Sequence, residues 1–209
     1  MAVVFSIQNE AGNIVAVWEI VENEDDLIKK FPFNDKMTSQ IIKFRNQSRK
    51  LEWLASRALL YQYTGLIPNV EYKEESGQPY IQGFNKNISI THTVGYAAIA
   101  ISDSSPAGVD IERPRERILR VAKKFVHPDE YSYIPKNKEI SYYTLIWCAK
   151  ETLFKMIKRG GVIFNEELYI SPFNVESEGV LNAKESNGTI TEYILQYITT
   201  PDFYLVWHY

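Results

Sequence analysis

The sequence predicts an α+β protein made of two similar halves, residues 1–104 and 105–209. Two observations support this fold class. Short runs in which apolar and polar residues alternate, typical of half-buried strands, are interspersed with longer segments whose apolar residues recur at helical spacing. The order of elements is also shared by the two halves, although the letters contain no internal repeat. With 209 residues and 45% hydrophobic content, the chain can bury one large core or two small ones.

The first half should open with a β-hairpin, because residues 3–7 and 14–20 alternate around a polar segment at 9–13. A long helix is expected over about 35–63, with a break near Ser48, since its apolar residues fall on one side and Gly65 and Pro68 follow it. Short strands are expected around 80–81, 88–90 and 96–101. Residues 102–106 are interpreted as a connector between the halves.

The second half should begin with a strand at 108–112, followed by helices over about 118–125 and 129–134. Pro128 and the two acidic residues after it are typical of a helix start. A long helix is expected from about Ser141 to Arg159, ended by Gly160 and Gly161, because glycine readily adopts the left-handed conformation of a C-terminal cap. Further strands are predicted at 168–170, 191–198 and 203–207.

Composition narrows the class of protein. The single cysteine, Cys148, excludes an internal disulfide framework, and the first residues lack the basic region of an export signal. No apolar stretch approaches the roughly 20 residues needed to cross a bilayer. With a net charge of −3, we expect a cytoplasmic protein that binds neither membrane nor nucleic acid. Basic residues are nevertheless concentrated at 43–57 and 113–124, on solvated helix faces or opposite a negatively charged partner.

Three carboxylates are candidates for one metal site. Asp110 and Glu112 are two residues apart on a predicted strand, so their side chains share a face. Glu151 lies on the predicted long helix and can join them if that helix packs beside the strand. Three carboxylates about 5 Å apart would repel by roughly 3 kcal/mol per pair at an effective dielectric near 20, so the cluster demands a cation or a proton. Ligands that are all oxygen suit Mg²⁺.

Each candidate also has an ordinary structural explanation. Glu151 and Lys155 have the i, i+4 spacing of a surface ion pair. Asp110 and Glu112 alone could cap the end of a strand, and His92 alone could be a hydrogen-bonded structural histidine. The functional interpretation therefore depends on the order and spacing of all the fragments together.

The same fragments resemble a known family. Gly-Val-Asp-Ile-Glu at 108–112, and Trp-Cys-Ala-Lys-Glu at 147–151 followed by Lys155, resemble the two signature motifs of the 4′-phosphopantetheinyl transferases. Ile-Ser-Ile-Thr-His-Thr at 88–93 is similar to the family's Asn-Ile-Ser-His-Ser segment, and Gly-Gln-Pro at 77–79 to its Gly-Lys/Arg-Pro segment. The length of the chain is similar to that of the long, monomeric Sfp-like class.

The resemblance implies a pseudo-twofold protein with coenzyme A bound in the cleft between its halves. It implies transfer of 4′-phosphopantetheine from coenzyme A to a serine of an apo acyl or peptidyl carrier protein, with release of adenosine 3′,5′-bisphosphate. Asp110, Glu112 and Glu151 would hold Mg²⁺ against the pyrophosphate, so that Asp110 also contributes to the coenzyme A site. Glu151 would take the serine proton, and Lys155 would offset charge on the phosphates.

Binding of the phosphates of coenzyme A is assigned by the same resemblance to Arg49, Arg57, Thr91 and His92. Gln78 departs from the family's pattern, which has Lys or Arg there to face the 3′-phosphate. The lost charge leaves Arg49 as the expected phosphate partner, because arginine grips phosphate bidentately, with Arg57 as the second choice.

Three classes of function remain open at this point. Besides the transferase, a metal-dependent phosphoesterase or nuclease could use the same three acids, and a non-catalytic module could simply hold coenzyme A. For the transferase, the basic stretch at 113–124 would steer an acidic carrier protein toward the site.

Overall fold

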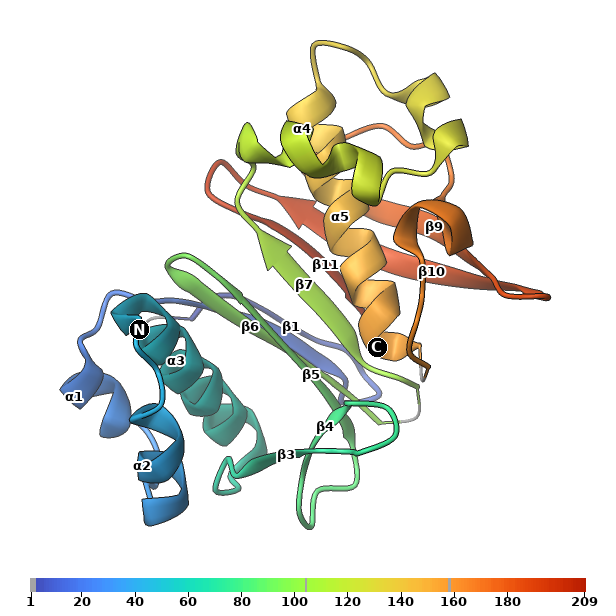
Figure 1. The fold of residues 1–209 in the computed structure, drawn as a ribbon. Coiled ribbons are helices and arrows are strands. Elements are labelled where there is room, and N and C mark those ends of the chain that lie inside the picture. The colour runs from blue at the N-terminus through green and yellow to red at the C-terminus, as the bar shows by residue number, and fades with distance from the viewer. Residues whose placement is uncertain (1–2, 104, 158) are drawn as a thin grey trace. The chain divides into compact units, whose positions relative to one another are not determined.

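The computed structural model describes residues 3–103, 105–157 and 159–209, which form helices and antiparallel sheets (Figure 1). The chain divides into two compact units: one runs to Ala107 and includes Tyr209, and the other is Gly108–His208. The predicted α+β class is confirmed. The predicted boundary between the halves falls at residue 104, which lies outside the described residues, so that boundary stays a prediction. None of the described helices is both long and apolar enough to span a membrane.

The first unit is built on a four-stranded sheet. Strands β1 (Val3–Gln8) and β2 (Ile14–Glu19) form the predicted hairpin, and β6 (Tyr96–Ser102) and β5 (Asn87–Thr93) complete the order β1-β2-β6-β5. Helix α3 (Gln47–Thr64) packs on this sheet, and the apolar core of the unit fills the space between them. Helix α1 (Glu24–Ile28) and a small ribbon of β3 (Val70–Tyr72) and β4 (Pro79–Ile81), of which α1 and β3 were not predicted, complete the unit.

The break predicted near Ser48 in the helical region 35–63 is misplaced, because two separate helices, α2 (Asp35–Ile41) and α3, are divided at residues 42–46. Each helix begins at an asparagine whose side chain accepts backbone hydrogen bonds, Asn34 from the N–H of Met37 and Asn46 from those of Ser48 and Arg49. Such N-caps satisfy donors that have no partner inside the helix. The second cap therefore fixes Arg49 in the first turn of α3.

The second unit is a five-stranded antiparallel sheet with a long helix across one face (Figure 1). The strand order is β7 (Gly108–Glu112), β11 (Tyr204–His208), β10 (Ile190–Thr199), β9 (Glu178–Ser186) and β8 (Leu168–Ile170), of which β9 was not predicted. Helix α5 (Glu139–Met156) packs on β7 and β11. It buries Leu145, Ala149 and Leu153 completely, as its apolar spacing predicts.

The second unit also contains short helices: α4 (Arg117–Val121), η1 (Ala122–Lys124), η2 (Pro128–Tyr133) and α6 (Phe164–Glu167). Much of this region, predicted as ordinary helix, is 3₁₀ helix. The predicted end of the long helix at Arg159 is also wrong. Ile157 already has extended backbone and is only 7% exposed in the core, so the helix ends at Met156, and residue 158 lies outside the described residues.

Gly108 allows α5 to approach β7 closely. A Cβ atom at this position would lie 2.7 Å from the carbonyl oxygen of Thr152 and 2.8 Å from Cγ of Met156, distances at which neighbouring atoms must move. The first residue of the Gly-Val-Asp-Ile-Glu segment therefore sets the spacing between the strand that carries two of the acids and the helix that carries the third.

Candidate active site

The predicted site residues fall in two groups, one in each unit. Asp110, Glu112, Glu151 and Lys155 belong to the unit Gly108–His208, and Arg49, Arg57, Thr91 and His92 belong to the other.

Asp110 lies on the side of β7 that faces helix α5. Asp110 is 5% exposed, and its Oδ1 accepts a hydrogen bond of 2.8 Å from Nζ of Lys155. The same ammonium group donates to the backbone carbonyl of Val109, also at 2.8 Å. Lys155 therefore bridges the helix to the strand at the first acid of the motif, and it is not the isolated surface ion partner of Glu151 that the i, i+4 spacing allowed.

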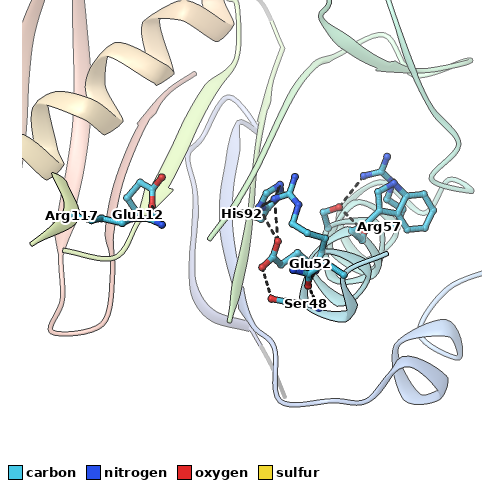
Figure 2. Close-up of polar contacts among 10 residues, drawn as sticks. Ser48, Glu52, Arg57, His92, Glu112 and Arg117 are labelled. Carbon is cyan, nitrogen blue, oxygen red and sulfur yellow. Dashed lines mark hydrogen bonds and ion pairs between the residues drawn. The ribbon is translucent and has the colours of Figure 1, made fainter. Parts of the chain in front are cut away.

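Glu151 is one turn before Lys155 on α5 and is sensitive to both acids of β7. Burial, and next the negative charge of Asp110, raise the pKa of Glu151 to about 7, while Lys155 opposes this rise and Glu112 adds to it. Glu112 itself is in contact with solvent and lies 3.8 Å from Arg117, a pair visible in Figure 2. The three acids therefore share one electrostatic environment. It contains too little positive charge to keep the carboxyl group of Glu151 fully ionised at neutral pH.

These acids do not form a ready-made metal cage. Among the described residues, no group of three or more His, Cys, Asp or Glu side chains is placed to hold a metal ion by itself. Mg²⁺, however, is commonly held by one or two carboxylates together with waters and the phosphates of a substrate. The oxygen donors, and the raised pKa of Glu151, fit a divalent cation that arrives with a phosphate ligand.

Cys148 adjoins this group but does not suit a nucleophile. Its side chain is completely buried on α5, and its Sγ lies 3.9 Å from the carbonyl oxygen of Tyr204. Burial, reinforced by the carboxylates of Asp110 and Glu112, raises the pKa of the thiol well above its usual value. A protonated, enclosed thiol is inert, because the thiolate is the reactive form.

The second group gathers around a carboxylate that the motifs did not single out. Glu52, on α3, is 3% exposed, and it accepts hydrogen bonds from Oγ of Ser48 at 2.8 Å and Nη1 of Arg49 at 3.2 Å. Nδ1 of His92, on β5, lies 3.1 Å from the same carboxylate. Figure 2 shows His92 beside Glu52, and Nη1 of Arg49 is 2.6 Å from Nδ1 of His92.

The side chains of Arg49 and His92 remain accessible in this cluster. Burial would raise the pKa of Glu52, but hydrogen bonds from His92 and Ser48, and the charge of Arg49, hold it below its usual value. Glu52 is thus ionised at neutral pH and orients two side chains that are themselves partly exposed, with side-chain exposures of 50% for Arg49 and 30% for His92. Such a pair can meet an anion.

Arg57 and Thr91 are less accessible to a phosphate ligand than the family resemblance suggested. Arg57 is 4% exposed, donates to Oγ of Ser56 at 3.0 Å and lies over the Trp53 ring at 4.3 Å. Thr91 is 6% exposed in β5. Gln78 is half-buried in the turn before β4, where its carbonyl accepts the N–H of Lys73. Arg49 and His92 are therefore the more accessible candidates for phosphate.

A large hollow opens beside Glu112 and Glu151 within the second unit. Its volume is about 1040 Å³. Aromatic rings form one wall: Trp147 lies 5.0 Å from Phe125 and 5.9 Å from Phe164, measured between centroids, and Phe154 lies 5.5 Å from Phe164. The lining also includes basic residues of the 113–124 stretch: Arg113, Arg115, Arg117, Arg120 and Lys124.

Sequence reasoning missed this hollow and the acids Glu52 and Glu130. Glu52 could have been found, because it is three residues after Arg49 on a predicted helix and therefore on the same face. Glu130 was interpreted only as a residue of a helix start. It does complete a capping box with His127, but it is also fully buried, which local sequence does not reveal.

The comparisons with known proteins agree with the motifs. Residues 106–198 match the family model described as the 4′-phosphopantetheinyl transferase superfamily. The chain is 33% identical over 132 residues to the 4′-phosphopantetheinyl transferase gsp of Aneurinibacillus migulanus, which is 60% of this chain and 55% of that protein. It is 32% identical over 91 residues to the 4′-phosphopantetheinyl transferase Sfp of Bacillus subtilis (strain 168), which is 42% of this chain and 40% of that protein.

A third relative, the 4′-phosphopantetheinyl transferase AcpT of Salmonella typhi, is 27% identical over 118 residues, which is 54% of this chain and 60% of that protein. The matched part of the chain thus spans about half the length of these relatives. The matched region contains both signature motifs, so the resemblance drawn from them is confirmed: residues 106–198 match the 4′-phosphopantetheinyl transferase superfamily, and the chain resembles its Sfp-like members.

Proposed function

We propose that this protein transfers 4′-phosphopantetheine from coenzyme A to a serine of an apo acyl or peptidyl carrier protein, releasing adenosine 3′,5′-bisphosphate. The observation that carries the proposal is the state of Glu151. Its pKa is about 7 because it is buried beside Asp110 and Glu112, and Lys155 is bound to Asp110. An acid that is half-ionised near neutral pH, grouped with two others and a lysine, suits proton transfer next to a phosphate.

In the proposed reaction, the serine oxygen bonds to the β-phosphorus of coenzyme A, and the bond from that phosphorus to the bridging oxygen breaks. Glu151 accepts the serine proton, directly or through an intervening water. Lys155 offers its ammonium to the negative charge that develops on the phosphates. Mg²⁺, when bound by Asp110, Glu112 and Glu151, would neutralise the pyrophosphate and align its phosphorus.

The nucleotide end of coenzyme A is proposed to meet Arg49 and His92, with weaker contributions from Arg57 and Thr91. This assignment requires one ligand to be served by both units, as in the pseudo-twofold arrangement with a cleft that the family resemblance implies. It is supported by the exposure of Arg49 and His92, which are held in place by a carboxylate. We also propose that the protein acts as a monomer in the cytoplasm.

The hollow is the proposed docking site for the carrier protein. Its aromatic wall can receive an apolar side chain, and its arginines favour an acidic surface. Glu112 and Glu151 line the same hollow, so a docked serine would be near the acids.

One experiment separates the transferase from its alternatives. The protein is incubated with coenzyme A, MgCl₂ and an apo carrier protein, and the carrier is weighed by mass spectrometry. The proposal expects the mass of one phosphopantetheine to be added, and expects this addition to be lost in Glu151→Gln but kept in the matched surface variant Lys138→Gln. Cleavage of coenzyme A without an acceptor would indicate a phosphoesterase. Binding of coenzyme A with neither cleavage nor transfer would indicate a binding module.

A further inference from the structure

Lys150, the neighbour of Glu151 in the Trp-Cys-Ala-Lys-Glu segment, is buried and does not pair with the acids of the candidate metal site. Its side chain is 0% exposed, and its ammonium group donates three hydrogen bonds: to Oε2 of Glu130 at 2.8 Å, to the carbonyl of Phe125 at 2.7 Å and to the carbonyl of Phe164 at 3.2 Å. An ammonium group has three protons, so its donor capacity is used completely inside the protein.

Glu130 is equally enclosed and equally well bonded. Its Oε1 accepts the backbone N–H of Ile170 at 2.7 Å, and its Oε2 accepts that of His127 at 2.7 Å as well as the ammonium of Lys150. The pair therefore joins α5 to the end of η1, the start of η2, α6 and β8. A buried charge pair persists only when its remaining bonds are satisfied in this way.

Two of these bonds end on the wall of the hollow. Phe125 and Phe164 both line it, and the Trp147 ring lies between their rings. The carbonyl groups of both phenylalanines are held by the one ammonium of Lys150. Lys150 thus fixes the positions of Phe125 and Phe164 in the aromatic wall, although Lys150 itself does not line the hollow.

We infer that Lys150 and Glu130 are positioning residues that hold the wall of the docking hollow and so determine affinity for the carrier protein, without touching either substrate. The inference rests on the proposed function, since it assigns the hollow to the carrier. It separates the two lysines of the second motif: Lys155 acts beside Asp110, whereas Lys150 shapes the surface on which the partner docks.

The kinetic test compares Lys150→Met with Glu130→Gln, and uses Lys184→Met as the control. Lys184 belongs to the same unit and pairs with Glu192, but both side chains are exposed. Lys150→Met and Glu130→Gln should each raise KM for the carrier about tenfold, leave KM for coenzyme A within about twofold, and change kcat per folded molecule little. The control should change none of these constants.

A lysine that contacts substrate would behave differently. Lys150→Met would then lower kcat or raise KM for coenzyme A, and Glu130→Gln would not reproduce its effect. A loss of folded protein alone would lower the apparent kcat and leave both KM values unchanged. Either pattern would overturn the inference.

A second measurement does not depend on catalysis, so it remains decisive if no transfer occurs and the proposed function fails. Hydrogen–deuterium exchange is followed by mass spectrometry in native protein, Lys150→Met and Lys184→Met. In Lys150→Met, peptides covering 122–130 and 163–171 should exchange at least tenfold faster, while peptides of β1 and β2 should not change. Unchanged exchange in the first two regions would refute the role of Lys150 as a support for the wall.

Discussion

Glu151 illustrates how one residue can combine a cost in stability with a use in chemistry. Its carboxyl group is more readily protonated in the folded protein, with a pKa of about 7 against a reference value of 4.5, because it is buried next to Asp110 and Glu112. Without a cation, ionising it forces negative charges together. A positively charged ligand would therefore relieve the repulsion at this position, whereas without such a ligand the ionised carboxylate destabilises the fold.

This cost predicts how stability depends on pH. A raised folded-state pKa contributes stability that is fully present below pH 4.5 and is lost as the pH rises through about 7. In the presence of a chelator, Glu151→Gln should remove this loss and stabilise the protein at pH 8 by at most roughly 3 kcal/mol, less where solvent screens the charge. Urea unfolding of both proteins at pH 5, 6, 7 and 8 measures it. Parallel pH dependence in the two proteins would contradict the argument.

Gln78 is the other residue whose chemistry makes a specific prediction. It occupies the position at which the family resemblance predicts a Lys or Arg side chain facing the 3′-phosphate of coenzyme A. Gln78→Lys should therefore increase the ratio of kcat/KM for coenzyme A to that for 3′-dephospho-coenzyme A, by about tenfold if one charge-assisted contact of about 1.4 kcal/mol is gained. The variant Lys73→Gln, changed in the same turn, serves as control. An unchanged ratio in Gln78→Lys would show that position 78 does not meet the phosphate.

At the scale of single elements, packing of α5 against β7 controls the geometry of the acids. Gly108→Ala would place a methyl carbon against Thr152 and Met156, at distances too short to be accommodated without movement of the helix. Overpacking of this kind typically costs about 1–3 kcal/mol. Gly160→Ala is the matched control, because a Cβ atom there meets nothing within 4 Å.

We expect Gly108→Ala to lower Tm and to lower kcat in the folded fraction, because the helix carries Glu151 and Lys155. Gly160→Ala should change neither. Thermal unfolding by circular dichroism, together with the transfer assay, tests both statements. A Gly108→Ala protein with native Tm would mean that the helix can move away from the strand freely.

Helix α4 carries the charge that is proposed to attract the carrier protein. Arg117 and Arg120 are exposed and line the hollow. Reversing both to glutamate should raise KM for an acidic carrier at low salt, and the effect should shrink as added salt screens the charges. Lys138→Glu, an exposed reversal outside the hollow, is the control. If the double reversal leaves KM unchanged at low ionic strength, the basic stretch is only a solvated helix face.

The sequence allowed some elements to be predicted better than others, for physical reasons. Alternation located the hairpin of β1 and β2, although β2 is buried on both of its faces. The helical period located α5 through Leu145, Ala149 and Leu153. The break between α2 and α3 was placed too late, since the asparagine caps at Asn34 and Asn46 outweigh the continuous apolar pattern. β9 was missed because its polar residues face solvent along most of its length.

For the whole molecule, residue type singled out the candidate acids Asp110, Glu112 and Glu151, whereas the tertiary fold determines which groups surround them. The aromatic wall joins residues from distant segments, which no local pattern brings together. Glu52 and Glu130 are buried acids that each have a partner from another element, His92 in one case and Lys150 in the other. Their burial follows from the tertiary fold, so the sequence alone assigns them to the surface.

The proposal that both units serve one coenzyme A makes a prediction for the whole chain. Binding of coenzyme A with Mg²⁺ should slow hydrogen exchange in peptides covering 46–57 and 88–93 of one unit, and in peptides covering 108–112 and 147–155 of the other. Inorganic phosphate at the same concentration should protect the first pair alone, because Arg49 and His92 need only an anion. Protection by coenzyme A confined to a single unit would contradict the shared site. In His92→Ala, protection at 108–112 should require more coenzyme A, since one ligand that bridges two groups loses affinity at both when either group is weakened.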